Sequence, residues 1–262
     1  MFGFRERRQL IISLLIVAVL VAVGYVAVRT LLPEPTCEDG RRNQGEEDVD
    51  CGEPCVPCVL KHPKELEVFW VRAVRSRGSA YDVAARISNP NAKLGARSIE
   101  YEFELFDAAD LPVAARRGSA FAYPGENLHL VEIGLDVGER EAARAAVTVR
   151  RVEWVIADEV APDIAAGGRE YLTEEDVEGR RRSAIRAVIT NRTLEDLPEV
   201  AVSAIVFDGQ GNLFAVHRTV LGDLGAAESK PVKFVWGEMF ADAPGSFAIE
   251  ARSAALLPSD RP

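Results

Sequence analysis

The stretch that decides the fold is Ile99-Glu100-Tyr101-Glu102-Phe103-Glu104-Leu105, in which apolar and acidic residues alternate strictly. Successive side chains of a strand point to opposite faces, so this stretch predicts a strand with one face on a core and the other in water. Similar runs occur at residues 68–74, 83–87, 129–135 and 147–155. Short strands at this spacing, separated by turn signals such as Asn89-Pro90-Asn91, predict an antiparallel β-sandwich over residues 65–157.

The same pattern returns about 101 residues further along the chain, which predicts a second copy. Ile87-Ser88-Asn89 corresponds to Ile189-Thr190-Asn191, and Leu105-Phe106-Asp107 corresponds to Val206-Phe207-Asp208. We therefore expect a second sandwich over residues 169–256, a linker rich in Ala, Gly and Pro at 158–168, and a tail at 257–262. Each sandwich has its own alternating core, so each is predicted to unfold as a separate cooperative unit. The predicted fold class of the folded part is all-β.

Residues 10–28 form an uncharged apolar run, which is long enough to cross the hydrocarbon core of a bilayer as a helix. Arg5, Arg7 and Arg8 precede it, and positively charged flanks stay in the cytoplasm. We predict a cytoplasmic tail at 1–9, a single transmembrane signal anchor at 10–32 with the lipid bilayer as its partner, and extracytoplasmic domains after it. A cleaved signal peptide is the alternative, but the apolar core is long for one and no Ala-x-Ala site ends it.

All four cysteines, Cys37, Cys51, Cys55 and Cys58, lie in a short segment rich in Gly, Asp, Glu and Pro. Residues 33–64, which begin with a Pro-Glu-Pro exit from the helix, are predicted to form a stalk. Outside a membrane, cysteines pair to disulfides, and a segment with so small a core needs such covalent links. We predict two intramolecular disulfides among these four residues, with the connectivity left open.

Three other interpretations of this segment have a chemical basis. Cys55-x-x-Cys58 has the spacing of a zinc site, for which His62 lies near in the sequence, or of a redox motif. The carboxylates Asp39, Glu46, Glu47, Asp48 and Asp50 are the ligand type that calcium prefers. The matching second cysteine pair of a zinc site and the βαβ context of a redox motif are missing from the sequence, and a solvated acidic loop is the simpler account of the carboxylates.

Residues 35–58 resemble a cysteine-rich segment found in many bacterial envelope proteins. The resemblance rests on the motifs Cys-x-Asp-Gly, Asn-Gln-Gly-Glu, Val-Asp-Cys-Gly and Cys-x-x-Cys. This resemblance implies an extracytoplasmic, disulfide-held spacer and no activity.

A second resemblance concerns the strands. Phe103-Glu104-Leu105-Phe106-Asp107 is similar to the Phe-x-Leu-Tyr-Asp signature of a bacterial immunoglobulin-like domain family, with Phe106 in place of the tyrosine. The second copy keeps Val206-Phe207-Asp208 and has Ala204 in place of the first phenylalanine. The resemblance implies two tandem immunoglobulin-like domains in the cell envelope. Members of the family share no catalytic residues.

The remaining sequence gives little indication of chemistry. The net charge of −10 argues against nucleic acid as a partner. His129 is predicted to be a solvent-facing or satisfied strand histidine, and His217 is expected to lie in another strand. Asp208-Gly209-Gln210-Gly211-Asn212 is predicted to form a hairpin turn rather than a calcium loop. Trp70, Trp154 and Trp236 are expected in the core. No catalytic motif is present in the sequence, so we expect a non-enzyme without a cofactor, which binds or organises a protein partner outside the membrane.

Overall fold

The computed structural model describes residues 4–31, 36–158, 160–255 and 257, and the chain divides into two compact units, Met1–Lys61 and His62–Pro262. The first unit contains the helix α1 (Phe4–Leu31), followed by the cysteine-rich segment and the short helix α2 (Cys58–Lys61). The apolar span Arg7–Ala27 within α1 is long enough to cross a membrane, and none of it is buried inside the structure. The predicted Pro-Glu-Pro exit at 33–35 lies outside the described residues, as do Leu32 and residues 258–262.

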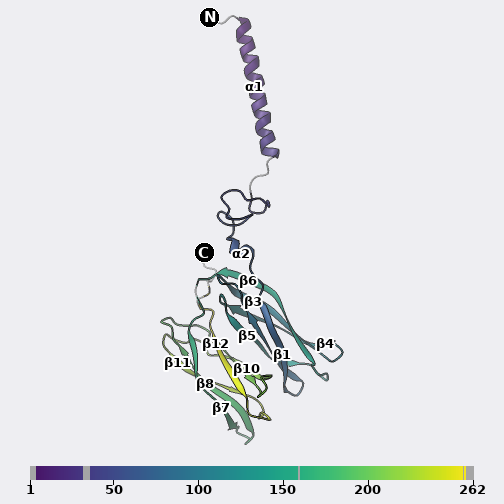
Figure 1. Cartoon of the computed structure of the whole chain (residues 1–262), viewed down its shortest axis with the longest axis vertical. Coiled ribbons are helices and arrows are strands. Elements are labelled where there is room, and N and C mark those ends of the chain that lie inside the picture. The colour runs from purple at the N-terminus through teal and green to yellow at the C-terminus, as the bar shows by residue number, and fades with distance from the viewer. Residues whose placement is uncertain (1–3, 32–35, 159, 256, 258–262) are drawn as a thin grey trace. The chain divides into compact units, whose positions relative to one another are not determined.

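The second unit is built from antiparallel strands, which confirms the predicted all-β class with one N-terminal apolar helix (Figure 1). The strands of its first half make two three-stranded sheets, ordered β1-β2-β5 and β4-β3-β6. We call them the first sheet pair. Its strands are β1 (Glu67–Arg77), β2 (Ala80–Ser88), β3 (Leu94–Phe106), β4 (Pro112–Ala122), β5 (Asn127–Asp136) and β6 (Arg144–Ile156).

The second half repeats this arrangement in the order β11-β8-β7 and β10-β9-β12, and we call it the second sheet pair. Numbered from its own first strand, it has the same strand order as the first pair. Its strands are β7 (Ile164–Glu175), β8 (Arg181–Asn191), β9 (Ala201–Phe207), β10 (Leu213–Val220), β11 (Ser229–Val235) and β12 (Ser246–Arg252).

Each sheet pair encloses a core of its own, and the alternation in the sequence is what fills it. In β3, Ile99, Tyr101, Phe103 and Leu105 are buried against residues of β2 and β5 from the facing sheet. The glutamates between them lie on the opposite face, where Glu102 pairs with Arg117 and Arg150 from the two neighbouring strands. The second core is filled in the same way, from Ile185, Ile189, Val202 and Phe234 among others.

A buried asparagine closes one end of each sheet pair. The Asn89 side-chain amide donates to the carbonyls of Leu94 and Tyr123, and its backbone N–H donates to Glu126. Asn191 bonds to the carbonyls of Glu195, Leu224 and Gly225, and its backbone N–H donates to Glu228. Neither asparagine is exposed. These contacts recur at the positions that the sequence comparison aligned.

The two sheet pairs also pack on each other, face to face. The outer side of the sheet β1-β2-β5 meets the outer side of β10-β9-β12, and a third apolar cluster lies between them. Its buried members are Ala84 and Val131 from the first pair and Ile205, Leu213 and Val216 from the second. Consequently β2 is buried on both faces from Tyr81 to Ala85, where one face in water was expected.

The linker and one strand also differ from expectation. Residues 164–168, predicted as the end of the linker, belong to β7, and residues 164–167 pair with β8 from Asn191 back to Val188. The connection between the two sheet pairs is therefore only residues 157–163. The strand β4 was not predicted, because its sequence, PVAARRGSAFA, has no clear alternation.

Candidate functional site

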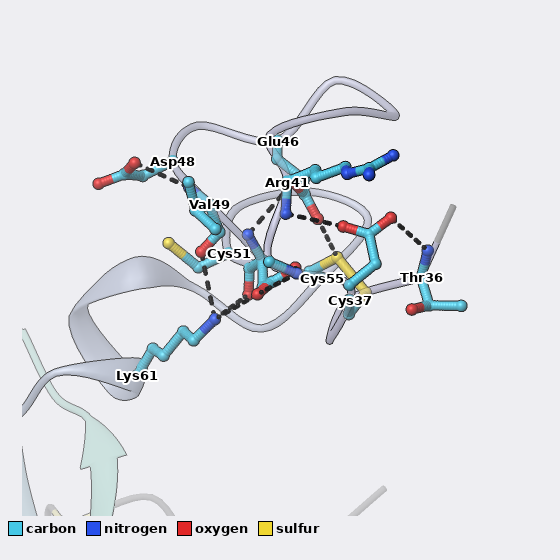
Figure 2. A network of polar contacts seen from close by, with 12 residues as sticks. Thr36, Cys37, Arg41, Glu46, Asp48, Val49, Cys51, Cys55 and Lys61 are labelled. Atoms are coloured by element: carbon cyan, nitrogen blue, oxygen red, sulfur yellow. Dashed lines mark hydrogen bonds and ion pairs between the residues drawn. A yellow bond between two sulfur atoms is a disulfide. The ribbon is translucent and has the colours of Figure 1, made fainter. Parts of the chain in front are cut away.

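The cysteine-rich segment contains both of the predicted disulfides. Cys37 is bonded to Cys55 (Figure 2) and Cys51 to Cys58, and no cysteine is free. The two sulfurs of the Cys55-x-x-Cys58 motif would be joined to each other in a redox motif of that kind. Here each is joined to an earlier cysteine. All four sulfurs are therefore committed to disulfides, and none is a thiolate that could bind zinc.

The acidic side chains of this segment organise the fold, and two of them are not solvated as expected. Glu46 is 3% exposed and Asp50 is 8% exposed. The Asp50 carboxylate accepts the Gly40 N–H at 3.0 and 3.1 Å and lies 3.4 Å from the Lys61 ammonium. The Glu46 carboxylate accepts the backbone N–H groups of Asn43 and Asp50. These buried carboxylates hold loops together where an apolar core is lacking.

One group of potential metal ligands occurs among the described residues: Cys37, Glu46 and Cys55. A Glu46 oxygen lies 3.1 Å from the Cys55 sulfur and points toward the Cys37–Cys55 disulfide (Figure 2). Since both sulfurs are bonded to each other, this group does not bind a metal in its oxidised form. His62, the fifth candidate ligand of the zinc interpretation, is exposed and is not part of the group.

The faint calcium motif at residues 208–212 is a hairpin turn between β9 and β10, as predicted. The Asp208 carboxylate accepts the backbone N–H groups of Gln210 and Asn212, each at 2.8 Å. These hydrogen bonds lower the pKa of Asp208. Asp107 and Asp176 make the same contacts at two other hairpin turns. The aspartate that ends the Phe-x-Leu-Tyr-Asp-like stretch is thus a turn residue.

Charged and polar contacts surround the apolar contact between the two sheet pairs. Nδ1 of His129 lies 2.6 Å from the Glu250 carboxylate, and Arg218 reaches Glu132 at 3.1 Å. Glu132, 6% exposed, also accepts a hydrogen bond from the Tyr101 hydroxyl. Burial and the neighbouring Glu132 raise the pKa of Tyr101, so the tyrosine remains protonated and donates. His129 is therefore a satisfied strand histidine, and its partner is in the other sheet pair.

Two clefts flank this contact. One has a volume of about 560 Å³ and is lined by charged side chains such as Arg218 and Arg252, which are already paired with Glu132 and Glu126. The other is larger, about 760 Å³. Clefts of this size between packed domains are common places for ligands to bind.

The larger cleft has two chemically different walls. The second sheet pair contributes Phe214, Trp236 and Phe240, whose rings contact one another at centroid distances of 4.9 and 5.0 Å. The first sheet pair contributes Asp82, which is 7% exposed and accepts the Gly134 N–H at 2.8 Å. Burial raises the pKa of Asp82, an effect that hydrogen bonds from the Gly134 N–H and the Ser76 side chain, and the charge interaction with His217, partly oppose.

The sequence did not identify this cleft. Trp236 was assigned to the core and is in fact partly buried, with its indole N–H donating to the Val216 carbonyl at 3.2 Å. No sequence motif marks Asp82 as a site residue, because it is a single aspartate within a strand. The signal was the acidic residue inside the otherwise apolar run Tyr81 to Ala85, which marks a charge that must be buried or face a cleft.

No family model matches the chain, and no curated protein matches it. Among solved structures, the red sea bream transglutaminase is 12% identical with a TM-score of 0.24, and the match covers 75% of this chain and 30% of that one. A GH2 beta-galacturonidase from Eisenbergiella tayi, bound to glycerol, is 11% identical with a TM-score of 0.23, over 74% of this chain and 41% of that one. The chain spans less than half the length of either, and TM-scores this low support no argument.

Proposed function

We propose that this chain is a single-pass membrane protein that holds a non-catalytic binding or scaffold module outside the cytoplasm. The observation that carries the proposal is the order of two features along the chain, in which the apolar helix α1 comes first and a segment with two disulfides follows it. A helix long enough to cross a bilayer is followed directly by a segment whose four cysteines are all paired, and disulfides persist on the oxidising side of a membrane. Arg5, Arg7 and Arg8 before the helix favour a cytoplasmic N-terminus.

The module itself is proposed to be two tandem immunoglobulin-like domains. Each sheet pair has six antiparallel strands in the same order, and the buried asparagines Asn89 and Asn191 make matching contacts. This internal symmetry supports the repeat inferred from sequence and the resemblance to the bacterial immunoglobulin-like family. Such domains typically present surfaces to other proteins, so we propose a protein partner outside the membrane.

Two measurements test the topology. A reporter that is active only outside the cytoplasm, fused after Pro262, should be active, and a cytoplasm-only reporter at the same place should be silent. Replacing Arg5, Arg7 and Arg8 by glutamate should weaken this orientation, because it removes the positive charges that fix it. An active cytoplasmic reporter on the unmodified chain would overturn the proposal.

A third measurement tests the disulfides and the alternative of a zinc or redox protein. Intact-mass analysis of protein that was alkylated without reduction should show no alkylated cysteine. Reduction before alkylation should add four alkyl groups. Four alkylated cysteines without reduction, or a mass gain equal to bound zinc, would instead support the alternative at Cys55 and Cys58.

A further inference from the structure

We infer that the larger cleft between the two sheet pairs binds the free carboxyl terminus of a protein partner whose last side chain is apolar. The inference rests on the proposed binding function, for which it names a site and the chemistry of the occupant. Three features of the cleft support it. One wall is aromatic, an exposed arginine lies at the rim, and a buried carboxylate that can accept hydrogen bonds lies on the wall that faces the aromatic rings.

The aromatic wall suits an apolar side chain. Phe214, Trp236 and Phe240 are all partly buried rather than fully buried, and Met239 beside them is 40% exposed. Rings that are already held by packing against one another lose little further freedom on binding, so they form a preorganised apolar surface. Apolar contact of this kind supplies affinity for a side chain but does not select a chain end.

Arg77 is the feature that selects a carboxylate. It ends β1 at the rim of the cleft, and the structure gives its guanidinium no ion pair or hydrogen bond among the described residues. Its Cδ lies 4.0 Å from the position of a Cβ at Gly237, so the side chain reaches across to the second sheet pair. The neighbouring Arg75 and Arg116 are occupied by Glu141 and by the carbonyls of Ile133 and Gly134.

Asp82 supplies an acceptor for the last backbone N–H groups of such a chain. It is the buried carboxylate of the cleft, and it accepts hydrogen bonds from the Gly134 N–H and from the Ser76 side chain, which leaves acceptor positions for a further N–H. A carboxylate that burial has stripped of water gains most from a further N–H donor. The aromatic wall therefore suits the apolar side chain, the Asp82 carboxylate suits a peptide N–H, and the Arg77 guanidinium suits the terminal carboxylate.

The test uses the full chain in detergent micelles, labelled with ¹⁵N at tryptophan, which gives indole signals from Trp70, Trp154 and Trp236. The probe is the peptide acetyl-Gly-Gly-Phe as a free acid. We expect it to shift the Trp236 signal saturably and to leave Trp154 unchanged. The same peptide with a C-terminal amide, and acetyl-Gly-Gly-Gly as a free acid, should each bind about tenfold more weakly.

Variants of the chain distinguish recognition of the peptide carboxylate from nonspecific binding of the peptide. Arg77→Gln should abolish the preference for the acid over the amide, while Glu238→Gln, which removes an exposed negative charge from the same lining, should tighten binding of the acid. Arg117→Gln, on the exposed face of β4 away from the cleft, is the matched control and should bind as the unmodified chain does. Unchanged indole shifts of the free variants verify that each is folded.

Equal binding of acid and amide to the unmodified chain, or no shift of the Trp236 signal, would overturn the inference. Either result would leave the membrane topology untouched, since the reporter experiment does not depend on the cleft. An active cytoplasmic reporter, in turn, would overturn the proposed function whatever the peptides do.

Discussion

Gly118 illustrates how one residue without a side chain leaves room for the buried contact between Tyr101 and Glu132 inside the first sheet pair. A Cβ at this position of β4 would meet the Tyr101 ring and hydroxyl and the Glu132 carboxylate well inside contact distance. We expect Gly118→Ala to lower the free energy of unfolding by about 1–3 kcal/mol, the usual cost of overpacking. The matched control is Gly167→Ala in β7, where a Cβ meets nothing within 4 Å. Urea unfolding of both variants checks this, and equal midpoints would contradict it.

The contacts of Asp176 predict how the stability of the fold depends on pH. Backbone N–H groups of Arg180 and Glu178 and the Arg180 guanidinium, partly opposed by burial, lower its pKa to about 2 from an ordinary value of 3.8. Because the folded-state pKa is depressed, the ionised carboxylate stabilises the hairpin above about pH 4, and this contribution disappears as the pH falls through about 2. The difference in stability between the unmodified chain and Asp176→Asn should therefore shrink over this window. A difference that is the same at pH 2 and pH 6 would contradict the assignment.

At the scale of strands, the sequence predicts those strands that have one face in solvent. It does not predict which strands are covered on both faces. The alternation of residues 99–105 places β3 correctly, because its outer face is solvated. In β2 and β9 the buried runs Val83-Ala84-Ala85 and Ala204-Ile205-Val206 are continuous, which is the pattern of a strand covered on both faces. That pattern is in the sequence, but a short apolar run does not say what covers it. The candidate site follows from this packing, so it was not predictable either.

The sequence predicts a linker at residues 164–168, where the structure has a strand, for a related reason. Ala and Gly are typical of flexible connections. They are also tolerated in a strand that is hydrogen-bonded to a neighbouring strand of the same sheet. Here β8 supplies the partner, and Gly168 takes a left-handed φ of 54° at the register shift between Gly167 and Glu170. Composition alone does not distinguish these two uses.

The strand β3 also carries the clearest prediction about a core. Phe103 is fully buried and packs edge-on against Tyr101 at a centroid distance of 5.5 Å. Phe103→Ala should cost about 3–5 kcal/mol, since it removes a buried ring and leaves a cavity. Phe69→Ala on β1 is the control, because Phe69 is 55% exposed and its loss should cost less than about 1 kcal/mol. Denaturant unfolding of the two variants measures the difference, and similar costs would mean that Phe103 is not a core anchor.

For the molecule as a whole, the third apolar cluster changes the expected unfolding. The sequence predicts that each sandwich unfolds as a separate cooperative unit, and it follows that Phe103→Ala would unfold residues around 65–155 and leave 169–253 folded. With Ala84, Val131, Ile205 and Val216 shared between the sheet pairs, we expect the loss to spread. Hydrogen exchange should show lower protection in β8 as well as in β2. Unchanged protection of β8 would restore the picture of two independent domains.

The pairing of the cysteines has a consequence for how the chain withstands proteolysis. The two disulfides overlap along the sequence: Cys51 lies between Cys37 and Cys55, and Cys58 lies beyond them. A single cut anywhere between Cys37 and Cys58 therefore leaves at least one disulfide spanning the break. Had Cys37 paired with Cys51 and Cys55 with Cys58, a cut at residues 52–54 would have released everything that follows. A protease that cuts once between Cys37 and Cys58 should therefore free the second unit from the helix only after a reductant is added, so that release requires both events together.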